Sequence, residues 1–176
     1  VLESRAILEI IKGRLDIIAK FHDMIVNDSP ETTSSKSLDN MHDLIAGYPW
    51  LLNPEWQILS EEKAISTELR QWGQADLVKE EDSDNRYDFL ALTGPNKLVV
   101  IEIKRADYAV TIKELDRLNY YAERLRSAHR DISMVFIGGG KYDISEHELE
   151  QRRRRTDLEI LEWSTIYQRT HNYYNH

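Results

Sequence analysis

The alternation of hydrophobic and polar residues divides this chain into helical and extended segments. In residues 2–26, apolar positions recur at steps of three and four residues, which predicts a long amphipathic helix. Residues 111–127 have the same period and predict a second amphipathic helix. The mainly apolar segments 98–103 and 132–137 predict strands, and residues 158–163 predict a last one.

Polar and proline-containing segments mark the expected boundaries between these elements. We predict an N-terminal helix over residues 1–27, which acts as a connector or a dimerisation helix, a polar linker over 28–37, and one domain over 38–176. A helix starting near Leu38 is expected to stop before Pro49, because proline disfavours helical geometry in the residue that precedes it.

The remaining elements are short. Residues 75–78 are expected to form a short strand, and the three glycines that follow the 132–137 run are expected to form a flexible turn. A helix over 146–155 and a closing helix or tail over 164–174 complete the pattern. Periodicity alone therefore favours an α/β or α+β sandwich.

Composition excludes several classes of protein. The chain has no cysteine, so disulfide frameworks, thiol nucleophiles and zinc–thiolate sites are excluded. No apolar run approaches the roughly 20 residues that cross a bilayer, so a cytoplasmic protein without membrane segments is expected. The net charge of −8 argues against general coating of nucleic acid and confines any phosphate contact to a local basic patch. Because the sequence starts at valine, we expect an upstream domain in a longer chain.

The segments 86–90 and 98–104 carry ionisable residues where a core strand would be apolar. The intervening Thr93-Gly94-Pro95-Asn96 is a turn signal, and a hairpin centred on Pro95 places Asp88 opposite Glu102. Alternation puts Lys104 on the same face as Glu102. Directly opposed side chains lie roughly 5 Å apart, so the two carboxylates are expected to repel unless a cation lies between them.

Such a cluster suits hydrolysis of a phosphodiester with the help of a metal ion. Asp88 and Glu102 are oxygen ligands of the kind that Mg²⁺ or Mn²⁺ prefers, and the backbone carbonyl of Ile103 is a further candidate ligand. The ammonium of Lys104 is placed to position an attacking water or to stabilise the transition state.

An aspartate, a short hairpin and a Glu-x-Lys strand together resemble the PD-(D/E)XK nuclease superfamily, with Asp88, Glu102 and Lys104 on its motif positions. Tyr87 stands where that motif often has proline. The segment 44–52, Leu-Ile-Ala-Gly-Tyr-Pro-Trp-Leu-Leu, precedes the motif and narrows the resemblance to the Shedu-type nuclease domain. The ordered set covers residues 38–137.

The resemblance implies a fold, an activity and partners. It implies an α/β restriction-endonuclease-like core, a central mixed β-sheet flanked by helices, here with an extra N-terminal helix. It implies a Mg²⁺-dependent endonuclease acting on nucleic acid, expected to be DNA, in antiphage defence. Such domains are often homo-oligomers and are often attached to a regulatory region.

The resemblance also suggests supporting residues. Relatives carry a glutamine before the tyrosine on the helix after the motif strand; here Tyr121 matches the tyrosine, whereas Arg117 takes the glutamine position. An acidic residue on the opening helix often joins the site. The candidates here are Asp39 and Asp43.

Arg86 and Arg105 flank the motif residues and are candidate contacts for phosphate. Two alternatives to an active enzyme remain open. One is an inactive module of the same fold that binds nucleic acid or a partner protein. The other is an assembly domain in which the first helix pairs subunits, with Glu102 and Lys104 as an ordinary surface pair.

Overall fold

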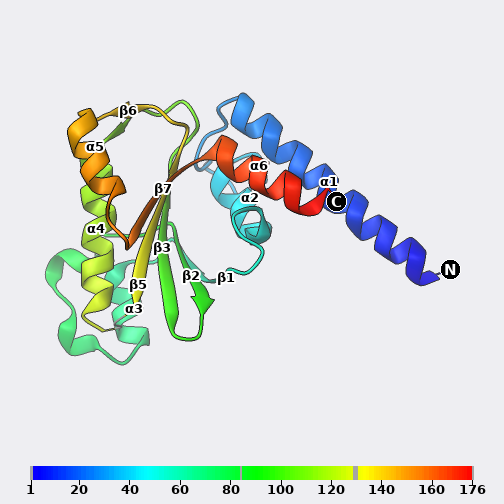
Figure 1. Cartoon of the computed structure of the whole chain (residues 1–176). Coiled ribbons are helices and arrows are strands. Elements are labelled where there is room, and N and C mark those ends of the chain that lie inside the picture. Colours follow the sequence, from blue (N-terminus) through cyan, green and yellow to red (C-terminus); the bar gives the residue numbers. More distant parts are fainter. Residues whose placement is uncertain (1, 84, 129–130, 176) are drawn as a thin grey trace.

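A mixed five-stranded sheet forms the centre of the molecule, with the strand order β1-β2-β3-β5-β7 (Figure 1). This computed structural model describes residues 2–83, 85–128 and 131–175. The strands of the sheet are β1 (Gln57–Glu61), β2 (Phe89–Gly94), β3 (Lys97–Ile103), β5 (Ile132–Gly138) and β7 (Leu158–Glu162). The first three pair antiparallel and the last three pair parallel, so β3 has an antiparallel neighbour on one side and a parallel neighbour on the other.

Helices cover both faces of this sheet (Figure 1). One layer contains α1 (Leu2–Val26), α2 (Met41–Gly47) and α6 (Trp163–Tyr174); the other contains α3 (Ile65–Gln71), α4 (Ile112–Arg126) and α5 (Glu146–Arg153). Short 3₁₀ turns lie at Pro49–Leu51, Ala75–Leu77 and Glu80–Ser83, and β4 (Val110–Thr111) pairs with β6 (Tyr142–Asp143) beside the main sheet. The expected α/β class, with a mixed sheet between helices and an extra N-terminal helix, is confirmed.

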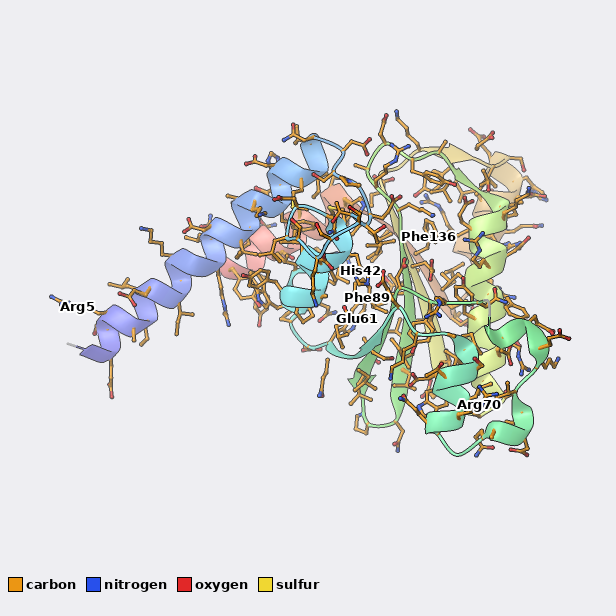
Figure 2. The ribbon with its side chains drawn as sticks, turned by 180° about the vertical axis from the view of Figure 1, so that it is seen from behind. Arg5, His42, Glu61, Arg70, Phe89 and Phe136 are labelled. Atoms are coloured by element: carbon orange, nitrogen blue, oxygen red, sulfur yellow. The ribbon has the colours of Figure 1, made fainter. Side chains whose placement is uncertain are left out.

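Two hydrophobic cores explain why the central strands are apolar on both faces. Val99 and Ile101 of β3 pack into the core under α1, α2 and α6, whereas Leu98 and Val100 pack into the core under α3 and α4. Since both faces of β3 are covered, its residues 98–101 form an unbroken apolar run, and Glu102 is the buried exception. Figure 2 shows Phe89 and Phe136 inside the two cores.

The structure differs from the sequence-based expectation at two places in the first half of the domain. Residues 75–78 do not form the expected strand; Ala75–Leu77 is a 3₁₀ turn, tied to α4 because Arg124 donates to the carbonyl of Leu77. The edge strand β1 was not expected. Its burial pattern is irregular, and a bulge between Ile58 and Ser60 interrupts the period of two that identifies strands.

The two halves of α1 have different surroundings. Residues 3–16 are exposed, and this half extends away from the body of the molecule, with Arg5 near its far end (Figures 1 and 2). In the second half, Ile18, Phe21 and Met24 are buried, and the Phe21 ring meets the ring of Trp163 edge to face at 5.9 Å. The division at residues 27 and 37 stays a prediction. Within the described ranges, no helix combines the length and hydropathy needed to span a bilayer.

Candidate active site

The hairpin between β2 and β3 has the predicted register. Leu90 lies opposite Val100 and Leu92 opposite Leu98, and the ladder ends at the pair of Phe89 with Ile101. Asp88 immediately precedes β2, so the next pair in this register is Asp88 with Glu102. The sequence therefore located the two carboxyl groups at the point where the paired strands separate.

Side chains replace the missing ladder bonds at this point. The backbone N–H of Asp88 donates to Oε1 of Glu102 at 2.9 Å, and the N–H of Ile103 donates to Oδ2 of Asp88 at 2.8 Å. Each carboxyl group thus satisfies a backbone donor that the separating strands leave unpaired. These bonds hold both side chains between β2 and β3.

The environment makes the two carboxyl groups hard to ionise together. Burial and the nearby charge of Asp88 raise the pKa of Glu102 well above its ordinary value, and only 8% of Glu102 is exposed. Burial also raises the pKa of Asp88, although the N–H of Ile103 and the charge of His42 partly offset this effect. A pair of acids with raised pKa values in a partly enclosed site is typical of functional sites.

Lys104 belongs to the same cluster. Lys104 is two residues from Glu102 along the chain, and its charge lowers the pKa of both Asp88 and Glu102. Its Nζ lies 4.9 Å from the centre of the Tyr108 ring. The backbone is anchored separately, because Nε1 of Trp163 donates to the carbonyl of Lys104 at 2.7 Å. The Lys104 side chain is therefore available to substrate, because Trp163 holds the backbone of this residue.

The opening helix begins at Met41 and not near Leu38, so Asp39 lies before it and only Asp43 lies on it. Both acidic candidates have other partners. Asp39 pairs with Lys20 at 3.2 Å, and Asp43 accepts from the N–H of Ser37 at 2.7 Å and from the amide of Asn40 at 2.9 Å. In the part of the chain that the structure describes, neither carboxylate hydrogen-bonds to a member of the Asp88 cluster. A catalytic role for either one stays a prediction.

A histidine on α2 contacts the residue that follows Asp88. His42 is 3% exposed, and its ring stacks on Phe89 at 4.6 Å (Figure 2). Its Nε2 is buried without a hydrogen-bond partner among the described residues, 3.7 Å from a Glu62 oxygen and 3.9 Å from a Glu61 oxygen. A pocket of about 200 Å³ opens beside these three residues. Sequence reasoning missed this group because no histidine spacing signals it.

The candidate phosphate contacts differ in their availability. Arg86 is exposed and donates weakly, at 3.3 Å, to the carbonyl of Glu62. Arg117 is exposed on α4, and its charge acts to lower the pKa of the Tyr108 and Tyr121 hydroxyls. Arg105 is engaged, because its guanidinium donates to Oδ2 of Asp28 at 2.8 Å.

Two buried tyrosines border the site. Tyr121 of α4 is 3% exposed, and burial followed by the charge of Glu102 raises the pKa of its hydroxyl. Tyr87 is fully buried; its hydroxyl donates to Glu68 at 2.8 Å and lies 2.6 Å from the hydroxyl of Ser60. Tyr87 therefore fixes the backbone next to Asp88 from the side of α3.

The residues present meet part of the requirement for a metal ion. No cluster of three or more His, Asp or Glu residues arranged for a metal occurs in the described ranges. Asp88 and Glu102 supply two carboxyl groups, and the carbonyl of Ile103 stays a predicted ligand. Mg²⁺ commonly binds through one or two carboxylates and fills its remaining positions with waters and substrate phosphates, so this pair fits that ion.

Comparison with known proteins yields one structural match. The chain resembles a solved structure of EndoMS in complex with double-stranded DNA, with a TM-score of 0.50 and 21% identity. The match covers 75% of this chain and 46% of that chain, so this protein spans less than half of its neighbour. No protein-family profile matches the sequence. No curated protein matches it either. The structural likeness shows that this chain shares the fold of the matched part of that structure.

Proposed function

We propose that this protein is a metal-dependent nuclease of the PD-(D/E)XK type that hydrolyses phosphodiester bonds in DNA. The observation that carries the proposal is the pair of bonds that fixes Asp88 and Glu102 between two separating strands, with Lys104 beside them. The nuclease-like fold and the DNA bound by the EndoMS neighbour support the same activity and substrate.

The role of each side chain follows from its place. Asp88 and Glu102 would hold Mg²⁺ or Mn²⁺, which offsets the burial that raises the pKa of both carboxyl groups and the charge of Asp88 that further raises the pKa of Glu102. The bound ion would supply an activated water and neutralise charge on the phosphoryl oxygens. Lys104 orients the attacking water and stabilises negative charge on the phosphate. Arg86 and Arg105 bind flanking phosphates, and Tyr121 packs behind Glu102.

The direct test is nicking of a supercoiled plasmid in Mg²⁺, in Mn²⁺ and in EDTA. We expect nicked and linear products from the wild type with metal, and none from Glu102→Gln. The matched control is Glu159→Gln, which changes an exposed glutamate on β7. Undiminished nicking by Glu102→Gln would overturn the assignment. DNA binding without nicking in any metal would instead support the inactive module.

The Shedu-type resemblance of residues 38–137 extends the proposal to antiphage defence in the cytoplasm. We expect cells that express the protein, with any regulatory domain to which it is attached, to resist some phages. Cells that express Glu102→Gln should lose that resistance. Equal plaque counts with and without the wild-type protein, over a broad panel of phages, would remove the defence role while leaving the nuclease intact.

We also propose that the chain forms a dimer through the first half of α1. This half exposes Leu8 and Ile10 by 64% and 58%, together with Ile7, Ile11 and Leu15. Arg14 packs over the rings of Trp50 and Tyr174, but the apolar side chains that precede it are exposed. So short a helical segment is marginal in water without packing, which favours a partner. A second copy is the favoured partner, because two sites can cut two strands of a duplex and the same surface on both copies gives a closed assembly.

Light scattering tests the dimer. Deleting all of α1 is unsuitable because Ile18, Phe21 and Met24 belong to the core. Replacing Ile7, Ile10 and Ile11 by asparagine should instead halve the molar mass without unfolding the domain. A wild type that is monomeric at micromolar concentration would contradict the proposal, as would a variant that keeps the mass of a dimer.

A further inference from the structure

The connection between α1 and α2 places two carboxylates on the loop that follows Lys104. Asp28 accepts from the Arg105 guanidinium through Oδ2 and from the N–H of Asp107 through Oδ1, both at 2.8 Å. Glu31 accepts from the N–H of Arg105, also at 2.8 Å. One guanidinium and two backbone N–H groups therefore converge on two carboxylates, directly beside the candidate catalytic residue.

The loop that carries these donors is fixed independently of the carboxylates. Trp163 holds the carbonyl of Lys104 at its start. Gly139, in the turn after β5, approaches so closely that a Cβ there would lie 1.6 Å from the carbonyl oxygen of Ala106. Lys141 pairs with the side chain of Asp107. The donors thus keep their positions when Asp28 and Glu31 move.

We propose that these donors form a binding subsite for a backbone phosphate of DNA, and that Asp28 and Glu31 occupy this subsite in the free protein. This inference rests on the proposed nuclease function and adds a form of control to it. A carboxylate and a phosphate accept the same charge-assisted bonds from guanidinium and N–H groups. The segment Asp28–Glu31, here named the acidic strap, competes with the substrate.

The energetics allow the strap to be displaced. The Asp28 and Arg105 side chains are 33% and 38% exposed, so their ion pair is partly hydrated. Ion pairs in such positions contribute little to stability and weaken further in salt. The strap backbone has separate anchors, since the N–H groups of Met41 and His42 donate to the carbonyls of Pro30 and Glu31. The carboxylates can leave while α2 stays in place.

A purely structural tether would have the same contacts but different consequences. Removing the carboxylates of a tether lowers stability and leaves DNA affinity unchanged. Removing the carboxylates of a competitor raises DNA affinity. Asp28→Asn is a suitable change because Asp28 has a left-handed φ of 51°, which asparagine also tolerates.

The experiment measures binding of a fluorescein-labelled DNA duplex by anisotropy in EDTA, at several salt concentrations. We expect the double variant Asp28→Asn/Glu31→Gln to bind about fivefold to tenfold more tightly than the wild type at low salt. The control Asp23→Asn/Glu55→Gln removes two exposed acids elsewhere and changes net charge equally. An equal gain in the control, or no gain in the strap variant, would overturn the inference.

Arg105→Gln tests whether the guanidinium and the strap carboxylates belong to the same subsite. In the wild type this change should lower DNA affinity less than in the strap variant, because Asp28 competes with the phosphate for the guanidinium. In the strap variant the same change should remove most of the gain. Additive effects of the two changes would contradict a shared subsite. Thermal unfolding of every variant checks that the fold is kept.

The experiments distinguish failure of the phosphate subsite from failure of the nuclease function. Binding in EDTA does not require cleavage, so a gain in affinity without nicking supports the subsite and removes the nuclease. Metal-dependent nicking with unchanged affinity in the strap variant supports the nuclease and removes the subsite.

Discussion

The carboxyl cluster, formed by Asp88 and Glu102 at the end of the β2–β3 ladder, and the free half of α1 depart from the usual distribution of residues in opposite directions. In the carboxyl cluster, Glu102 lies beside Asp88 and is only 8% exposed. On α1, isoleucine and leucine side chains face water, with Ile10 58% exposed. Buried charge and exposed apolar surface both oppose folding or solubility.

The difference indicates what each region lacks. Two acids with raised pKa values are stabilised by a cation, whereas an apolar helix face is stabilised by another protein surface. Among the residues that the structure describes, no hydrogen bond or ion pair joins the two regions, so each can be changed alone. Variants of the carboxyl cluster should alter catalysis and metal binding, and variants of the free half should alter assembly. The following changes test this separation.

The largest effect is expected for catalysis at the carboxyl cluster. Lys104→Ala should lower the cleavage rate by about 10²- to 10⁴-fold. The change removes the ammonium that orients the attacking water and stabilises negative charge on the phosphate. The fold should survive, since Trp163 binds the backbone of Lys104 and not its side chain. The control is Lys97→Ala, an exposed lysine at the other end of β3. Comparable losses in both variants would contradict the assignment.

A comparison within α1 should give the next largest effect. Ile18 is 2% exposed, and Ile18→Ala should lower the free energy of unfolding by about 2–5 kcal/mol through a cavity in the core. Ile10→Ala removes the same atoms from an exposed site and should change it by less than about 0.5 kcal/mol in the monomer. Urea denaturation measures both. Equal losses would show that the free half of α1 packs against the domain.

The hydroxyl of Tyr87 should contribute less. Tyr87→Phe leaves the buried Glu68 without one donor and should cost about 1–3 kcal/mol. Tyr173→Phe, at an exposed ring, is the control. If both substitutions leave the unfolding curve unchanged, Tyr87 stabilises the fold through the packing of its ring and not through its hydrogen bond to Glu68.

The smallest effect is a dependence of stability on pH. The pKa of Glu102 is raised in the folded state, so the native protein holds this proton more tightly than the unfolded chain. Stability should therefore fall as pH rises from the ordinary value of 4.5 through the raised pKa. In EDTA, Glu102→Gln should lack this component and unfold a few degrees higher than the wild type at neutral pH, roughly 2–4 °C for each kcal/mol.

Calorimetry in EDTA at several pH values measures the difference between the two proteins. Addition of Mg²⁺ should raise the melting temperature of the wild type and leave Glu102→Gln nearly unchanged. An identical pH dependence in the two proteins would show that Glu102 is ionised without penalty in the folded state.

Sequence reasoning located the parts of the site that depend on local geometry. The turn at 93–96 and the period of two determined the register, and the register placed Asp88 opposite Glu102. The helices over 2–26 and 111–127 followed from their apolar period. These features depend on residues within about twenty positions of each other, which a single sequence contains.

Contacts between distant segments were not predictable in the same way. The bonds of Asp28 and Glu31 to the loop at Arg105 join residues more than 70 positions apart, and the polar segment 28–37 resembled an unattached linker. His42 reaches its place because α2 packs on Phe89. Spacing along a chain carries no information on such packing. No sequence pattern therefore predicted the contacts of the acidic strap or the position of His42.

The pairing of α1 with α6 has a consequence for the order in which the molecule assembles. The first helix of the chain rests on the last, through Phe21 and Trp163, and Trp163 also holds the carbonyl of Lys104. During synthesis, β2 and β3 emerge well before Trp163 does. The hairpin can form early, but the loop after it gains its anchor only after Trp163 has been synthesised. A ribosome-bound nascent chain would therefore carry both acids without the finished catalytic geometry.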